Sequence, residues 1–282
     1  MELEVSSSRL ATASENYTAK THLCPGKLGR NRRRDSQVVL RRQSRGIFRI
    51  IDSGMLPVKA KMTDEEEPRQ WEVRVCTHRT CRKSGSLDTV ELLRGLASPN
   101  ISVESCGCLG RCGMGPNLVI LPKGIFVSHC NTPAHVARLL DLQCGLSDPE
   151  NNLKALSLKQ QANRAFESGN IADAETLFSQ AINLQPSGGL HLLHSNRSAA
   201  WLAKGDAYAA LEDAKLASVL APKWHVPHLR KGEAYMVIGD YLSAKTSYAE
   251  ALLLDPSLRR SKSYQSKLRE LEKVLTPSSA YA

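Results

Sequence analysis

The sequence of 282 residues predicts a small α/β domain followed by an all-α repeat domain, both behind a basic N-terminal segment. Alternating apolar runs and helical spacings between residues 70 and 145 predict the α/β domain. A pattern of Ala, Gly and Pro recurs with periods of 36 and 34 residues between residues 153 and 275, which predicts helical repeats.

The N-terminal segment, residues 1–69, carries most of the net charge of +10. Residues 1–62 hold 13 Lys and Arg against five Asp and Glu, a balance of +8, so the rest of the chain carries only +2. A segment rich in Ser, Thr and Arg predicts disorder and a transit peptide, here a chloroplast (stroma) address. A nuclear-type basic cluster at 30–34, a plain tail and a cytoplasmic location are the alternatives. The acidic run 63–68 then forms a linker.

Composition also limits the function classes. Because the basic charge is confined to this tail, we expect no nucleic-acid partner. No apolar stretch approaches the length of a membrane helix, so we expect no integral membrane segment. The eight cysteines are too few and too clustered for a secreted disulfide framework. No phosphate-binding loop, dinucleotide fingerprint or nucleophile elbow is present, and we predict that the protein is not an enzyme.

Within the α/β domain, the order of predicted elements is β-α-β-β-β-α. Residues 71–75, 101–103, 118–121 and 125–127 read as strands, with Val73 and Val75 on one face. Ser86 is a candidate cap for a helix that carries Leu87, Val90, Leu93 and Leu96 at helical spacing. Thr132 is a candidate cap for a last helix that carries Val136, Leu139, Leu140 and Leu142.

Two close cysteine pairs follow the first two predicted strands. Cys76 and Cys81 end the first strand, and Cys108 and Cys112 lie in a glycine-rich box with an additional Cys106. Thiolates are the natural ligands of iron–sulfur clusters and of zinc. Glycines in such a box allow tight turns and leave amides free to bond sulfur.

These motifs, Cys-x4-Cys and Cys-Leu-Gly-x-Cys-Gly-x-Gly-Pro, resemble those of the thioredoxin-like [2Fe–2S] ferredoxins. The resemblance covers about residues 70–144 and implies a thioredoxin-like fold and a [2Fe–2S] cluster. It implies Cys76, Cys81, Cys108 and Cys112 as ligands. Cys106 is an extra cysteine outside this pattern, and whether it substitutes for one of the four stays open. A zinc site and a redox thiol or disulfide site are the alternatives. Cys130 and Cys144 do not fit the ligand spacing and are expected to be idle thiols.

In the second domain, each predicted unit ends in a proline and turns at a glycine. Gly169, Gly205 and Gly239 mark the inner turns. These units resemble three tetratricopeptide repeats, at about 155–188, 191–224 and 225–258. Helical spacing from Tyr264 to Leu275 then predicts a capping helix. The recurring positions are Ala174, Phe178, Ala181 and Pro186, then Ala210, Ala214, Ala217 and Pro222, then Ala244, Tyr248, Ala251 and Pro256.

Four polar residues on the predicted inner helices resemble the carboxylate clamp of tetratricopeptide co-chaperones. They are Lys159, Asn163, Asn196 and Arg230. The resemblance implies an acidic C-terminal peptide of the Glu-Glu-Val-Asp type as partner, and such donors suit two carboxylates. The second basic residue that the family has in its third repeat is missing, because Val226 stands there; His225 and Lys231 are candidate substitutes.

The leading functional hypothesis is an iron–sulfur redox adaptor, an assembly factor or a redox sensor that docks a protein partner in the repeat groove, with a redox protein as a second partner. The alternative is a co-chaperone-like scaffold in which the cluster or metal is structural. A thiol enzyme that uses Cys106 or Cys130 ranks third, because no Cys-x-x-Cys pair is present.

Overall fold

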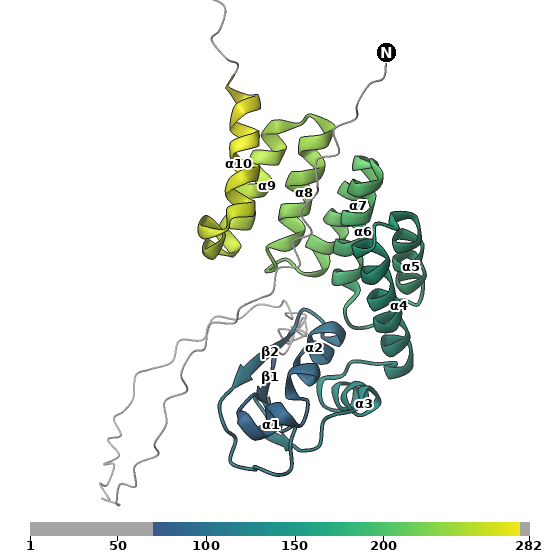
Figure 1. Ribbon diagram of the computed structural model, residues 1–282, viewed down its shortest axis with the longest axis vertical. Helices are drawn as coiled ribbons and strands as arrows, with labels where there is room; N and C mark the ends of the chain where they lie inside the picture. The colour runs from purple at the N-terminus through teal and green to yellow at the C-terminus, as the bar shows by residue number, and fades with distance from the viewer. Residues whose placement is uncertain (1–69, 277–282) are drawn as a thin grey trace, which may run out of the picture. The chain divides into compact units, whose positions relative to one another are not determined.

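The computed structural model describes residues 70–276 (Figure 1). The predicted transit peptide and linker lie outside the described residues, so the chloroplast address stays a prediction. The strands of the α/β domain are β1 (Trp71–Cys76), β2 (Ile101–Cys106), β3 (Leu118–Leu121) and β4 (Ile125–Val127), and its helices are α1 (Arg79–Lys83), α2 (Ser86–Leu96) and α3 (Pro133–Cys144).

The four strands form one mixed sheet in the order β2-β1-β3-β4. β1 and β2 are parallel, joined by the crossover through α1 and α2, whereas β3 runs antiparallel to both β1 and β4. Alternate residues of β1 point into the core, and Val73 and Val75 are fully buried, as the alternation predicted. Apolar residues of α2 and α3 complete this core.

Several local details differ from the sequence prediction. Helix α1 was not predicted, because its Arg79–Lys83 segment has no apolar periodicity. Gly85, in the left-handed region with φ 87°, precedes α2 in place of a side-chain cap, and Ser86 is the first helical residue. Leu87 and Leu142 are exposed rather than in the core. Thr132 caps α3 as predicted, since its side chain accepts a hydrogen bond from the His135 amide.

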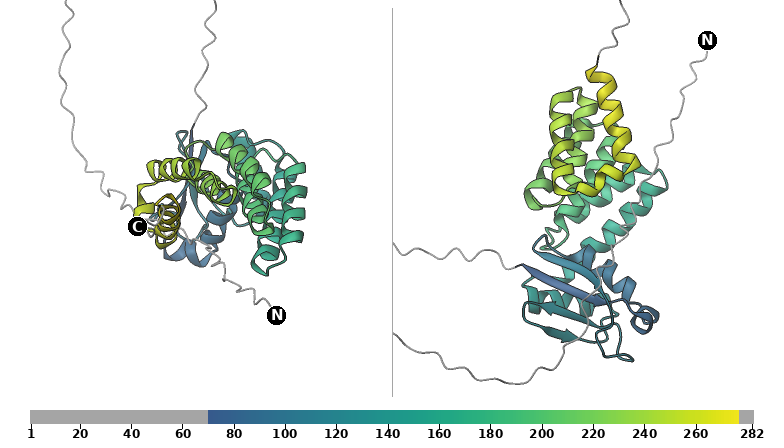
Figure 2. Two further views of the ribbon diagram at one scale, coloured as in Figure 1. Left: turned by 90° about the horizontal axis from the view of Figure 1, so that it is seen from above. Right: turned by 90° about the vertical axis from the view of Figure 1, so that its left-hand side faces the viewer.

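The second domain is a row of antiparallel helix pairs that stack side by side (Figures 1 and 2). Each pair turns at a glycine with positive φ, namely Gly169, Gly205 and Gly239. The recurring Ala, Phe and Tyr positions of the outer helices are buried, as the repeat pattern predicted. The elements are α4 (Pro149–Glu167), α5 (Ile171–Asn183), α6 (Leu190–Lys204), α7 (Ala207–Leu220), α8 (Val226–Ile238), α9 (Tyr241–Leu254), a 3-10 turn (Pro256–Arg260) and the capping helix α10 (Lys262–Leu275).

The first repeat helix starts earlier than predicted and is packed into both domains. Leu153 and Leu156 on α4 pack into the α/β core, whereas Ala155 and Ala162 on the same helix belong to the core of the first repeat. The loop between α5 and α6 also reaches the α/β domain, because the Gly189 amide donates a hydrogen bond of 3.1 Å to the Ala97 carbonyl at the end of α2.

Gly188 is the tightest point of this junction. A methyl group added there would clash with the carbonyl oxygen of Leu96 and lie 2.9 Å from the Leu146 side chain. We therefore expect Gly188→Ala to lower the free energy of unfolding by about 1–3 kcal/mol, measured by equilibrium urea denaturation. The control is Gly107→Ala, whose added methyl group would meet no atom within 4 Å and should change stability by less than about 0.5 kcal/mol. Equal stabilities of the two variants would contradict the close contact.

Candidate functional site

The four predicted clamp residues lie on the first helix of each repeat. Lys159 and Asn163 are on α4, Asn196 is on α6 and Arg230 is on α8. The structure joins the two asparagines directly, since Asn196 Nδ2 donates a 3.1 Å hydrogen bond to Asn163 Oδ1. This bond leaves the Asn163 amide nitrogen as a donor and the Asn196 oxygen as an acceptor for a ligand.

Among the described residues, the Lys159 ammonium has no counter-charge. Its side chain is partly buried, and no hydrogen bond or ion pair joins it to any other residue within 70–276. Burial lowers the pKa of Lys159 to about 8, because desolvation disfavours the charged form. Helix α2 contributes to this burial, since a Cβ atom on Gly95 would lie 3.3 Å from Lys159 Nζ.

Arg230, in contrast, already has an anion beside it. Its Nη1 atom lies 2.8 Å from Glu233 Oε2, and Lys267 of α10 lies 2.9 Å from the other oxygen of the same carboxylate. Burial opposes ionisation of Glu233, but the charges of Arg230 and Lys267 outweigh it and hold the pKa of Glu233 below its ordinary value. The Arg230 Nε atom is buried without a hydrogen-bond partner among the described residues.

Neither candidate substitute for the missing third-repeat cation lies free for a ligand. His225 Nδ1 lies 3.7 Å from Asp255, and Lys231 Nζ donates a 3.2 Å hydrogen bond to Glu250 on α9. Val226 itself is the first residue of α8. The predicted substitution by His225 or Lys231 therefore finds no support in these contacts.

His191, which the sequence analysis missed, lies in the first turn of α6. Its Nδ1 atom is buried and has no hydrogen-bond partner within 70–276. Burial, and then the charge of Lys159, lower the pKa of His191 to about 4, so the imidazole is neutral at pH 7. No motif marks this residue, because its neighbours come from other repeats.

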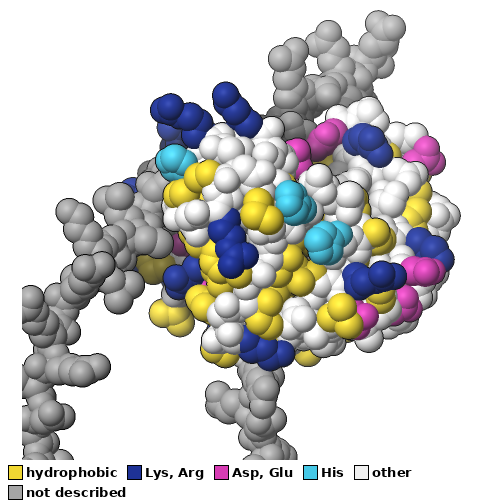
Figure 3. All heavy atoms as spheres, turned by 90° about the horizontal axis from the view of Figure 1, so that it is seen from below, with side chains coloured by type: hydrophobic (Ala, Val, Ile, Leu, Met, Phe, Trp, Pro, Cys, Tyr) yellow, Lys and Arg dark blue, Asp and Glu magenta, His cyan; other side chains and the backbone are white. Residues whose placement is uncertain are grey.

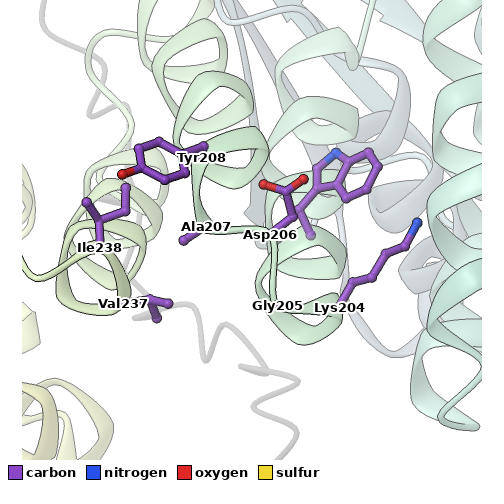
Figure 4. A pocket seen from close by; sticks show the side chains of 8 residues that line it. Lys204, Gly205, Asp206, Ala207, Tyr208, Val237 and Ile238 are labelled. Carbon is purple, nitrogen blue, oxygen red and sulfur yellow. The ribbon is translucent and has the colours of Figure 1, made fainter.

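One hollow on the described surface, of about 680 Å³, lies elsewhere on the repeats. Figure 4 shows its lining side chains at the end of α6, the start of α7 and the end of α8. None of the predicted clamp residues lines it. Lys204 lies 4.6 Å from the centroid of the Trp201 ring and pairs with Glu175, so these side chains are engaged within the repeat fold.

The predicted ligand cysteines lie at one end of the sheet. Cys76 and Cys81 are buried, whereas Cys108 and Cys112 are exposed, with their Sγ atoms 3.5 Å apart. Cys81 accepts a hydrogen bond from Asn117 Nδ2, and Cys108 accepts one from the Gly110 amide. A cluster or metal site requires several ligand atoms arranged around one centre. Within residues 70–276, no group of three or more His, Cys, Asp or Glu side chains could hold a metal ion.

A second hollow, of about 460 Å³, is lined by Thr77, His78, Arg79, Arg82 and Lys83 of the α/β domain.

The face of the molecule in Figure 3 mixes Lys, Arg and His side chains with hydrophobic ones. The basic side chains in Figure 3 are scattered and do not form the continuous stripe that follows a phosphate backbone.

Comparison with known proteins identifies the repeats. A model of the tetratricopeptide repeat matches residues 227–258. Similar curated proteins include "Protein STIP1 homolog" of Dictyostelium discoideum, 42% identical over 108 residues, and "Hsp70-Hsp90 organizing protein" of Triticum aestivum, 43% identical over 100 residues. The matches cover 38% and 35% of this chain but 19% and 17% of these relatives, so the chain spans less than one fifth of their length.

Among solved structures, the second TPR domain of the human RPAP3 protein, in complex with the HSP70 peptide SGPTIEEVD, is 26% identical. The likeness covers 44% of this chain and 98% of that domain, with a TM-score of 0.39.

The second domain therefore contains tetratricopeptide repeats, as the recurring Ala, Gly and Pro pattern predicted. The wheat relative is named as an organizing protein, and that name refers to no enzymatic activity. The predicted [2Fe–2S] cluster, and with it electron transfer, is wrong: the described residues form no metal-holding group, and the relatives are not named as iron–sulfur proteins. The prediction rested on the sequence spacing of four cysteines, Cys76, Cys81, Cys108 and Cys112. Spacing along the chain does not determine whether their sulfur atoms surround one centre.

The cysteines should differ in reactivity, because the thiolate is the nucleophile. The Gly110 amide, followed by Cys112, lowers the pKa of the exposed Cys108, whereas burial raises the pKa of Cys130 and of Cys144 to about 11. We expect limiting iodoacetamide at pH 7.5 to modify Cys108 well before Cys130 and Cys144, as measured by peptide mass spectrometry. Modification of Cys130 before Cys108 in the folded protein would contradict this order.

Proposed function

We propose that the repeat domain binds the acidic C-terminal tail of a chaperone, of the Glu-Glu-Val-Asp type, and that the protein is a co-chaperone-like adaptor. The observation that carries the proposal is the Lys159 ammonium, which has no anion beside it among residues 70–276 and lies on the same helix as Asn163. A peptide carboxylate would supply the missing counter-charge. The name of the wheat relative, which refers to Hsp70 and Hsp90, supports this choice of partner.

The contacts indicate that the clamp residues of different repeats contribute differently to peptide binding. Lys159, Asn163 and Asn196 offer a cation and amide groups that are not committed to other charges. Arg230 can contribute through its remaining nitrogen atoms, but Glu233 already neutralises part of its charge. We therefore assign the main carboxylate contact to the first two repeats.

We also propose a thioredoxin-like fold for the α/β domain. A parallel β1–β2 pair, an antiparallel β3–β4 hairpin and a closing α3 support it. In this proposal the α/β domain carries no cofactor and serves the adaptor by packing against the first repeat.

Peptide binding tests the main proposal. Fluorescence anisotropy with a labelled peptide that ends in Glu-Glu-Val-Asp should show saturable binding, and Lys159→Ala should weaken it about 10- to 100-fold, because a charge-assisted hydrogen bond is lost. Lys215→Ala on the outer helix α7, where the lysine is exposed, is the matched control and should bind like the parent. Binding of the C-terminally amidated peptide as tightly as the free acid would reject the clamp.

The affinity should also depend on pH through Lys159. In the free protein this lysine loses its charge above pH about 8, whereas a bound carboxylate favours the charged form and raises its pKa. We therefore expect an affinity that falls as the pH rises from 8 towards 10. The neighbouring His191, with a pKa of about 4, does not titrate in this range.

The control for this pH dependence is Lys159→Arg, since an arginine stays charged throughout. Its affinity can differ from that of the parent, but its profile between pH 8 and 10 should be flatter. Identical profiles for Lys159→Arg and the parent protein, measured by isothermal titration calorimetry, would show that another group titrates.

A further inference from the structure

The proposed clamp lacks one donor. Two carboxylates need several donors, and the third repeat offers Val226 where the clamp family has a second basic residue. The nearby His225 and Lys231 are engaged with Asp255 and Glu250. If the clamp binds a two-carboxylate ligand, another side chain must supply the remaining contact.

His191 has the chemistry and the location for this contact. It lies in the first turn of α6, the helix that also carries Asn196, and its Nδ1 atom is buried without a hydrogen-bond partner among residues 70–276. An unsatisfied buried ring nitrogen costs free energy, and a ligand that bonds to it recovers that cost. Two other histidines on the inner helices are already paired with a carboxylate, since His194 Nδ1 bonds to Asp213 and His228 Nδ1 to Glu250, although His228 Nε2 is also buried without a partner among the described residues.

Residues from two other parts of the chain act on the His191 imidazole. Its ring lies edge-on to Trp224, with centroids 5.3 Å apart and an interplanar angle of 86°, and Trp224 lies just before Val226 and α8. Burial, and then the charge of Lys159 on α4, lower the pKa of the ring. His191 is therefore in contact with the residue that precedes the third repeat and within the electrostatic reach of the first-repeat cation.

The α/β domain fixes the spacing of Lys159 and His191. Gly95 on α2 lies against the Lys159 side chain. The end of the same helix holds the loop just before His191, through the 3.1 Å hydrogen bond from the Gly189 amide to the Ala97 carbonyl. Both nitrogen groups are thus positioned from one helix, α2.

We propose that His191 is an additional ligand-binding residue, whose Nδ1–H donates a hydrogen bond to a carboxylate of an acidic C-terminal peptide that Lys159 binds at the same time. This proposal rests on the proposed function of the repeats. It assigns the role of the missing third-repeat cation to a neutral donor on the second repeat. A neutral donor can orient a carboxylate oxygen through a hydrogen bond but adds no positive charge. The electrostatic attraction of the carboxylate therefore comes from Lys159.

The test measures binding of the synthetic Glu-Glu-Val-Asp peptide to the full chain by fluorescence anisotropy at pH 7. We expect His191→Ala to weaken binding about tenfold, and His191→Gln, which keeps an amide donor, to recover part of the loss. The matched control is His135→Gln on α3, where the histidine is exposed, and it should bind like the parent. Thermal melting checks that each variant is folded.

Coupling to Lys159 gives a second readout. If both residues hold one carboxylate, the Lys159→Ala/His191→Ala double variant should lose less affinity than the product of the single losses. Parent-like binding by His191→Ala, in a protein that binds the peptide, would overturn this inference and leave the proposed function standing. A parent protein that does not bind the peptide would overturn both.

Discussion

The structure depends on one helix, α4, being packed into two cores at once. Its Leu156 is buried in the α/β core, and its Ala155 and Ala162 are buried against α5 and α6 in the first repeat. Burying one leucine side chain is worth about 1.5–3 kcal/mol, so this seam contributes substantially to holding the two domains together. Buried Asn152 strengthens it, because its amide donates hydrogen bonds to the Ser147 carbonyl and Ser187 Oγ. The position of α4 then sets the position of Lys159.

A second constraint is how the repeats satisfy their charges. The buried Asp213 carboxylate accepts two hydrogen bonds from Arg197 and lies 2.8 Å from His194, and this closed network holds α6 against α7. Such a network leaves nothing for a ligand. Lys159 has the opposite character, because its ammonium is desolvated and no described residue compensates for the lost water. Basic residues occur in both places, so their presence alone does not identify a binding group. What distinguishes Lys159 from Arg197 is that Arg197 is paired with a carboxylate.

The sequence predicts the repeats well because each unit repeats the same packing problem. Small or aromatic residues such as Ala174 and Tyr248 must fit between paired helices, so their spacing survives as a pattern. The strands of the sheet could also be predicted, because alternate residues of a strand point into the core and leave an alternating apolar pattern in the sequence. Leu87 and Leu142 were wrongly placed in the core. Helical spacing shows which side of a helix is apolar but not how much of that side is buried, and both leucines lie on the exposed part.

The site was less predictable, because it depends on side chains from separate repeats. Lys159, Asn163 and Asn196 could be found by resemblance, but the Glu233 carboxylate that Arg230 shares with Lys267 can be identified only once α8 and α10 are placed. His191 gains its role only from Trp224 and Lys159. The cysteine spacing predicted a cluster, since pairs along the chain suggest ligands without showing how they are arranged in space.

The junction also limits what can be inferred from other repeat proteins. In this chain, the first repeat is not a free end, because Gly95 and the carbonyl groups of Leu96 and Ala97 lie directly against Lys159, Gly188 and Gly189. Backbone groups at such short distances tolerate little displacement, so a change in the α/β domain must be transmitted to α4 or to the start of α6. The donors on these two helices are therefore set jointly by the repeat fold and by α2. A repeat domain with the same clamp residues but without this neighbour would hold the Lys159 ammonium in a more solvated setting, with a pKa closer to that of a free lysine.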